Sequence, residues 1–297
     1  MHNSYSSIPH RRVSFLSSLT SHCSTHRDAD GDGSIDSNEL REARRARLGE
    51  YLQTMDATDS MDLSSSGIGP EEASAISQKL ASNSTVTYVN LDANELGDEG
   101  AMWIAKAIRL NTTMKQLNLW RNDIGQLGAA HLASALARNQ TLKILNLDAN
   151  NVGNSGAVSI GAALRMNSSI ETLNLWKNGI GAPGARALAD ALVCNDTLTS
   201  LNLWQNQIDA DGAAALAEAL EQNRAMVASI MPNKASSASE TRRKQTQTEL
   251  AMASFRGGVL GKKLDTPDKQ AAKPRHRRVL YVDASRRADD GLLVRGP

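Results

Sequence analysis

Aromatic residues are scarce in this chain of 297 residues, at 3% of the sequence. Hydrophobic residues still make up 40%, so a core must be built mainly from Leu, Ile, Val and Ala, which suits thin stacked layers. The two cysteines, Cys23 and Cys194, lie far apart in unrelated contexts. They imply no disulfide framework and favour a reducing, cytoplasmic location. No run approaches the roughly 18 apolar residues that a transmembrane helix requires.

Negative charge is lacking at the end of the chain, although the formal net charge is only +1. Residues 232–297 hold 15 Lys and Arg against 7 Asp and Glu, whereas residues 1–60 hold 7 against 9 and residues 61–231 hold 11 against 16. Such a basic tail could contact acidic partners, or it could be a solvated linker; no specific nucleic acid is expected. The Arg- and Ser-rich residues 1–27 also resemble an organelle transit peptide in composition, which is an alternative to a cytoplasmic protein.

The sequence contains no recognisable set of catalytic residues. GGVLGKK at 257–263 departs from a phosphate-binding loop, because its glycines are too close and Lys263 stands where Ser or Thr is needed. Only one of the six histidines, His131, lies within the repeated region described next. No His, acid and nucleophile fall in register for a triad. We therefore expect no catalytic residue and no enzyme activity.

A 28-residue repeat is the main feature that is present. The segment YVNLDANELGDEGA returns four times, and its lead leucines are Leu91, Leu119, Leu147, Leu175 and Leu203. A fixed period of 20–29 residues headed by L-x-L-x-x-N indicates a leucine-rich repeat solenoid. With its helical second half, the unit resembles the ribonuclease-inhibitor type of leucine-rich repeat, which also occurs in NOD-like receptors. The resemblance implies a right-handed α/β solenoid with parallel strands on the concave face and helices on the convex face.

Residues 28–39, DADGDGSIDSNE, match the calcium-loop pattern D-x-[DN]-x-[DN]-G-x5-E and resemble the EF-hand loop of calmodulin-like proteins. Calcium takes six to eight oxygen ligands, which this spacing supplies. The candidate Ca²⁺ ligands are Asp28, Asp30, Asp32, Ser34 through its carbonyl, Asp36 and Glu39. An acidic surface turn is the alternative. We expect an EF-hand-like helix-loop-helix over 13–53, preceded by disorder over 1–12.

The solenoid is predicted over residues 57–231. Its repeats are 57–84, 85–112, 113–140, 141–168, 169–196 and 197–224. Leu63 lies one full repeat length before Leu91, so 57–84 is interpreted as a degenerate first repeat rather than as a second calcium loop starting at Asp62. We expect a closing strand at about 226–231. Residues 232–297 are predicted to be a mostly disordered basic tail, with VLYVD at 279–283 as its one strand-like piece.

Asparagines recur at the end of each predicted helix and after each predicted strand. The first set is Asn83, Asn111, Asn139, Asn167, Asn195 and Asn223, which we expect to end helices in the left-handed conformation. The second set is Asn94, Asn122, Asn150, Asn178 and Asn206, whose side chains are structural in the family that the repeats resemble. We expect no binding role for this second set.

The variable positions lie beside the fixed leucines, on the concave face. One outward column is Asn90, Asn118, Asn146, Asn174 and Asn202. The next is Asp92, Trp120, Asp148, Trp176 and Trp204, followed by Ala93, Arg121, Ala149, Lys177 and Gln205. Exposed aromatic and Arg side chains are typical of binding hot spots. The alternative is that the indoles only pack against their neighbours.

These observations predict a calcium-binding scaffold or calcium-responsive adaptor with an unidentified protein ligand on its concave face. The predicted anchors are Trp120, Trp176 and Trp204, and the residues that give selectivity are Asp92, Asp148, Arg121 and Lys177. The alternative is a non-catalytic regulator of an enzyme, such as a GTPase-activating or inhibitor-type scaffold, in which calcium is only structural.

Overall fold

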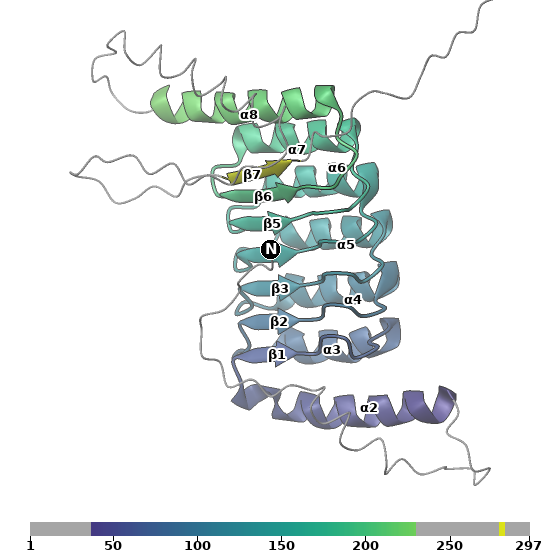
Figure 1. Ribbon diagram of the computed structural model, residues 1–297. Coiled ribbons are helices and arrows are strands. Elements are labelled where there is room, and N and C mark those ends of the chain that lie inside the picture. The colour runs from purple at the N-terminus through teal and green to yellow at the C-terminus, as the bar shows by residue number, and fades with distance from the viewer. Residues whose placement is uncertain (1–36, 230–278, 283–297) are drawn as a thin grey trace, which may run out of the picture.

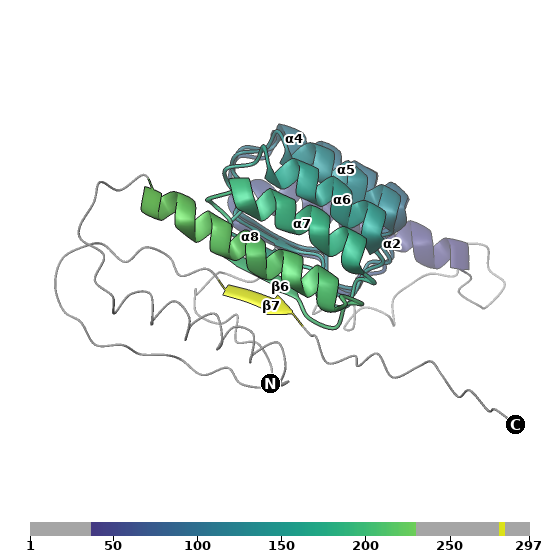
Figure 2. The same ribbon diagram turned by 90° about the horizontal axis from the view of Figure 1, so that it is seen from above.

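A computed structural model describes residues 37–229 and 279–282 of the protein. Its strands form one parallel sheet in the order β1 to β7, and the helices cover one face of that sheet (Figures 1 and 2). The strands are β1 (Ser60–Asp62), β2 (Tyr88–Asn90), β3 (Gln116–Asn118), β4 (Ile144–Asn146), β5 (Thr172–Asn174), β6 (Ser200–Leu203) and β7 (Val279–Val282). The helices are α2 (Ser37–Thr54), the short 3-10 helix η2 (Met55–Ala57), α3 (Pro70–Ser82), α4 (Gly97–Leu110), α5 (Gln126–Leu136), α6 (Gly153–Leu164), α7 (Ala182–Cys194) and α8 (Ala210–Ser229).

Every repeat contributes one strand and one helix, as the period of the sequence predicts. Strand partners are one repeat length apart throughout β1 to β6; Val89 pairs with Leu117, for example. The degenerate first repeat is confirmed, because β1 pairs with β2 in the same register. The Asp62 carboxylate is engaged in the repeat array, where its Oδ1 accepts hydrogen bonds from Ser64 N of its own repeat and from Asn90 Nδ2 of the next repeat. The α/β leucine-rich repeat solenoid is thus confirmed.

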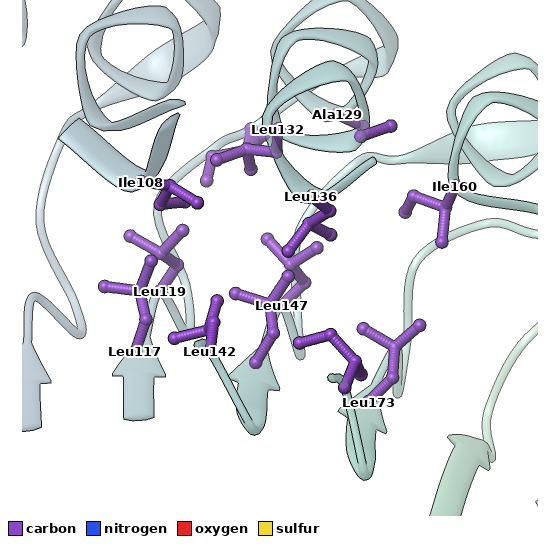
Figure 3. Packing of buried hydrophobic residues seen from close by; sticks show 14 of the residues in the cluster. Ile108, Leu117, Leu119, Ala129, Leu132, Leu136, Leu142, Leu147, Ile160 and Leu173 are labelled. Carbon is purple, nitrogen blue, oxygen red and sulfur yellow. The ribbon is translucent and has the colours of Figure 1, made fainter. Parts of the chain in front are cut away.

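The core lies between the strands and the helices (Figure 3). Leucines from the strand side, such as Leu119 and Leu147, point toward Ile108 and Leu136 on the helices, and all four are at most 1% exposed. A column of buried alanines lets each helix approach its neighbours closely. Its members are Ala101, Ala129, Ala157, Ala185 and Ala213. Aliphatic side chains of two sizes therefore fill most of the thin layers, as the composition predicts, and Tyr51 and Trp103 pack against this core from its margin.

The helix α2 covers the N-terminal end of the solenoid (Figure 1). Its Leu48 and Leu52 are buried in the common core together with Met55 of η2. Arg45 of α2 pairs with Glu71 and Glu72 of α3, so the contact has both apolar and ionic parts. The outgoing helix of the predicted helix-loop-helix is therefore the cap of the repeat array. Residues 1–36, with the rest of that predicted unit, lie outside the described residues.

The C-terminal end differs from the sequence prediction. The closing strand expected at about 226–231 is wrong, because α8 remains helical to Ser229. The strand that follows β6 is β7, which comes from the tail. Its residues Val279–Val282 fall on the one strand-like piece that the sequence showed in the tail. The predicted disorder concerns residues that otherwise lie outside the described ranges.

The helix-end asparagines are not left-handed, which corrects the sequence prediction. Asn223 does not end a helix at all, because α8 continues to Ser229. Asn83, Asn111 and Asn195 have extended backbones, with ψ of 135°, 135° and 120°. Their side-chain amides connect neighbouring repeats: Asn111 Nδ2 donates to Leu80 O at 2.7 Å, and its Oδ1 accepts from Met114 N at 2.7 Å. Because the amide satisfies a carbonyl at the end of the preceding helix, no left-handed residue is required.

Candidate protein-binding face

The face of the sheet opposite the helices, here called the strand face, carries the predicted anchors. Trp176 and Trp204 are stacked, with ring centroids 6.2 Å apart and an angle of 18° between the rings. Trp204 remains 47% exposed, whereas Trp176 and Trp120 are half-buried. The indoles therefore pack on each other, as one sequence interpretation has it, and still present a large apolar surface; the predicted role as binding anchors stays a prediction. Trp176 also buries its indole Nε1 without a hydrogen-bond partner among the described residues.

The strand face is acidic toward its N-terminal end. Asp92 Oδ2 accepts a hydrogen bond from Asn118 Nδ2 at 3.3 Å, and the Asn118 amide also donates to Asn90 Oδ1 at 2.9 Å. Burial raises the pKa of Asp92, and the nearby charge of Asp62 raises it further. An interacting cation would therefore find two neighbouring carboxylates held by an asparagine network.

Asp148 lies in the same column, between two tryptophans. Burial raises the pKa of its carboxyl to about 6, although the Trp176 backbone N–H opposes that shift by donating to Asp148 Oδ1 at 2.6 Å. A carboxyl with this pKa changes its charge between weakly acidic and neutral conditions. Because of this burial, Asp148 has a higher pKa than an ordinary surface aspartate.

The third column consists of residues in the left-handed conformation. Its members are Ala93, Arg121, Ala149, Lys177 and Gln205, with φ of 50°, 51°, 53°, 52° and 55°. The backbone N–H groups of the first four continue the ladder beyond the assigned strands; Lys177 N, for example, donates to Trp204 O at 3.0 Å. Arg121 and Lys177 are exposed. The chain therefore turns sharply next to each anchor and leaves these two cations free to meet a partner.

The turn asparagines are buried, as predicted, and they fix the turns from inside. Asn150 Nδ2 donates to Leu119 O at 2.9 Å, and Asn150 Oδ1 accepts from Asn122 N and Ile124 N, both at 3.0 Å. Asn94 and Asn206 accept two amides from the preceding repeat in the same way. Their structural role, which the resemblance implied, is thereby confirmed.

Asn122 departs from this pattern, because its Oδ1 is buried without a partner among the described residues. The preceding repeat turns differently there. Gly97, at φ +57°, donates its N–H to the backbone oxygen of Asn122 at 3.0 Å, and Gly153 does the same to Asn178 two repeats later. The solenoid therefore has two forms of turn, and they alternate from repeat to repeat over residues 85–196.

The way in which the helices are capped also differs between alternate repeats. Gly125 and Gly181 precede α5 and α7 and offer no side chain of their own. Asp98 of the preceding repeat accepts hydrogen bonds from Gly125 N and Gly128 N at 2.7 and 2.8 Å. Asn154 serves α7 in the same way. The sequence prediction missed these caps across repeats, although Asp98 and Asn154 occupy equivalent positions two repeats apart.

One further column of the strand face was also missed. It consists of Ser60, Tyr88, Gln116, Ile144, Thr172 and Ser200, all half-buried. Each lies two residues before the outward asparagine or Asp62 in its strand, so the period of two along a strand could have identified it. Ile144 adds an apolar side chain to the strand face, beside the column of outward asparagines.

The predicted calcium ligands are not tested by the structure. Asp28, Asp30, Asp32, Ser34 and Asp36 lie outside the described residues, and the backbone of Glu39 lies in the first turn of α2. Within residues 37–229 and 279–282, no group of three or more His, Cys, Asp or Glu side chains could hold a metal ion. The same part of the chain has no helix with the length and apolarity to cross a membrane.

Comparison with known proteins supports the repeat assignment. The leucine-rich repeat family matches residues 82–105, 110–133, 138–161, 167–189 and 194–217. A solved structure of leiomodin-1 actin-binding site 2 is 18% identical, with a TM-score of 0.40, and the alignment covers 71% of this chain and 98% of that one. The tropomodulin C-terminal domain of Caenorhabditis elegans is 14% identical, with a TM-score of 0.41 and coverage of 63% and 94%. No curated protein sequence matches.

The matched repeats and the parallel sheet show a leucine-rich repeat architecture, and stacked repeats of this kind form extended surfaces that can bind other molecules. The geometry of the strand face is consistent with such a surface. It combines a stacked, exposed aromatic pair with flanking cations and a carboxylate network.

Proposed function

We propose that the protein is a calcium-binding adaptor that holds another protein against its strand face. The observation that carries the proposal is the indole stack of Trp176 and Trp204, with Trp204 47% exposed. Monomeric proteins bury most large aromatic surface, and indole side chains contribute strongly where proteins bind each other. Trp120 extends the same column toward the N-terminal end of the sheet.

Charges around the anchors would select the partner. Asp92 and Asp148 are half-buried and would accept hydrogen bonds from a basic group, whereas the exposed Arg121 and Lys177 would meet an acidic one. Because left-handed turns hold both cations, their backbones lose little freedom when a partner binds. The partner that fits this face therefore has an apolar centre with both signs of charge around it.

The calcium part of the proposal rests on the sequence of residues 28–39 and on the course of α2. That helix begins at Ser37, within the predicted loop, and continues to Leu48 and Leu52 in the solenoid core. A calcium ion on the loop would thus act at one end of a helix whose other end is packed against the repeats. This arrangement supports a coupling between the loop and the repeat array.

The binding face is tested with Trp204→Ala and with Trp103→Ala as the matched control. Trp103 is half-buried on α4, where Lys106 Nζ lies 5.1 Å from its ring centroid, and it belongs to the helix side. Affinity capture from cell extract would identify the partner, and calorimetric titration of the purified partner would measure its affinity. We expect a loss of about 10-fold or more for Trp204→Ala and little change for Trp103→Ala. Equal losses, or none, would overturn the proposal.

Calcium binding is tested by calorimetric titration of the full chain and of the Glu39→Gln variant. A micromolar site that is weakened at least about 10-fold in the variant supports the proposed ligand set. No heat of binding in the unmodified chain would remove calcium from the proposal. Partner affinity measured with calcium and with a chelator then decides whether the adaptor responds to calcium.

A second candidate is that calcium is only structural and orders the N-terminal cap. The burial of Leu48 and Leu52 and the pairing of Arg45 with Glu72 favour it, because they make α2 part of the solenoid. A raised melting temperature with calcium and an unchanged partner affinity would support this candidate. In either case we propose a reducing compartment, to which the exposed free thiol of Cys194 is suited.

A further inference from the structure

The last strand of the sheet comes from a distant part of the chain. After α8 ends at Ser229, residues 230–278 intervene before β7 begins at Val279. β7 then lies parallel to β6, in the position that a seventh repeat strand would occupy (Figures 1 and 2). This pairing extends over four residue pairs, whereas each of the other neighbouring strand pairs has three. The contact is therefore as extensive as those within the repeat array.

The sequence of β7 repeats the pattern of a repeat strand. Leu280 is in register with Leu201 and Val282 with Leu203, the two positions whose equivalents are buried aliphatic residues in every repeat. The alternate residues, Val279 and Tyr281, are in register with Ser200 and Asn202 of the two outward columns. An offset of one residue would exchange these sets, so the aliphatic alternation specifies the observed register. The tail thus carries a segment with the pattern of a repeat strand.

An unpaired β6 would be a reactive edge. Its backbone N–H and C=O groups, aimed away from β5, would be open to any extended chain. Addition of a strand to such an edge is a known mode of peptide recognition, in which backbone hydrogen bonds give affinity and alternate side chains give specificity. In the described structure β7 occupies this edge over the whole length of β6.

We infer that the edge of β6 is a strand-addition site for an extended aliphatic segment, and that residues 279–282 of the same chain are its occupant. Residues 230–278 connect α8 to β7, and they hold 12 Lys and Arg against 4 Asp and Glu, a net charge of +8. Pairing of β7 with β6 therefore tethers both ends of a basic segment to the C-terminal end of the sheet. The inference does not depend on calcium or on the proposed partner.

A peptide of residues 277–285, RRVLYVDAS, labelled with a fluorophore, tests the site in the full chain. The Leu280→Asp variant should release the tail strand, because a charge at a core register position is costly to bury. We expect saturable binding of the peptide to this variant. Binding to the unmodified chain should be weaker by about 10-fold or more, because its own tail occupies the site at high local concentration. A control peptide with Leu280 and Tyr281 exchanged should not bind.

Amide hydrogen exchange and photo-crosslinking complete the test. Exchange in β6 should be faster by about 10-fold or more in Leu280→Asp, with that of β3 unchanged. A photoreactive benzoylphenylalanine in place of Tyr281, in an otherwise unmodified chain, should crosslink to residues 200–204 of the same molecule. Absent or equal peptide binding, unchanged exchange in β6, or crosslinks elsewhere would overturn the inference. A dimer that becomes a monomer in Leu280→Asp would also overturn it, because the occupant would be a second copy.

Discussion

The buried turn asparagines allow one prediction with an internal control. Asn150 and Asn122 occupy equivalent positions, 4% and 0% exposed, and both donate a hydrogen bond to a leucine carbonyl of the preceding repeat. Only Asn150 also accepts hydrogen bonds with its Oδ1. Replacing each with alanine therefore removes similar volume but different numbers of hydrogen bonds.

The expected magnitudes follow from the groups left without partners. In Asn150→Ala these are Leu119 O, Asn122 N and Ile124 N, for which Asn150 supplies the hydrogen bonds found. At about 1–2 kcal/mol for each such buried group, the free energy of unfolding should fall by about 3–6 kcal/mol.

The control leaves the backbone satisfied. In Asn122→Ala, Leu91 O still accepts from Asn94 Nδ2 and Trp120 O still accepts from Ala93 N. The substitution also removes an acceptor that was buried without a partner. The expected loss is therefore only about 1 kcal/mol.

Chemical denaturation of the full chain, followed by circular dichroism, measures both variants. The slopes of the transitions should match, so that the difference lies in the midpoint. Equal losses in the two variants would refute the reasoning, since they would mean that the accepting oxygen contributes nothing. A larger loss in Asn122→Ala would refute it more strongly.

Three further predictions concern caps, charge and stacking. Asp98→Ala should lower the free energy of unfolding by about 1 kcal/mol through loss of the α5 cap, and Asp98→Asn should largely retain stability, as Asn154 does the same task at α7; denaturation midpoints check both. The pKa of Asp148, raised to about 6, means that the folded protein binds this proton more tightly than the unfolded chain, so the contribution of this carboxyl to stability should be fully present below about pH 4 and be lost as pH rises to about 6. Asp148→Asn should remove that slope and add about 1 kcal/mol at pH 7, after allowance for the solvent near a half-buried carboxyl, as measured by denaturation across this pH range. Trp204→Ala should abolish the exciton signal of the indole pair in circular dichroism and cost about 1 kcal/mol, whereas Trp103→Ala should leave that signal intact.

Much of the solenoid follows from the period of the sequence alone. Leu91 and its equivalents fix the core side of every strand, and a constant period with no insertion leaves one register for the sheet. The degenerate first repeat was predictable for the same reason, since Leu63 continues the spacing. The position of the tryptophans on one face follows from the alternation of side chains along a strand.

The ends of the array could not be predicted in this way, because they have a neighbour on one side only. The residues at 226–231 were predicted as a strand from their place after the last repeat, yet α8 continues to Ser229. The strand that does complete the sheet begins only at Val279, farther along the chain than one repeat length reaches. The alternation of aliphatic residues in this segment predicted a strand, but it did not predict that the strand pairs with β6.

The backbone conformation of the helix-end asparagines could not be predicted from the sequence for a different reason. Local preference suggested a left-handed helix end, whereas Asn111 uses its amide to bond Leu80 O one repeat away and is extended. A hydrogen bond between repeats outweighs a local preference because it satisfies buried groups on both sides. Asp98 shows the same effect, since its partners Gly125 and Gly128 lie in the next repeat.

The alternation of anchor residues places the only neighbouring tryptophans among the described repeats at the C-terminal end of the strand face. Repeats with Asp92 or Asp148 in the anchor column use the turn with Gly97 or Gly153, and repeats with Trp120 or Trp176 use the other. Anchors of one kind are thus two strands apart, about 10 Å, which is too far for indoles to stack. The last repeat breaks the alternation by placing Trp204 next to Trp176, and this is where the described residues show a stacked pair. A partner that requires continuous aromatic surface should therefore bind across β5 and β6, beside the edge that β7 occupies.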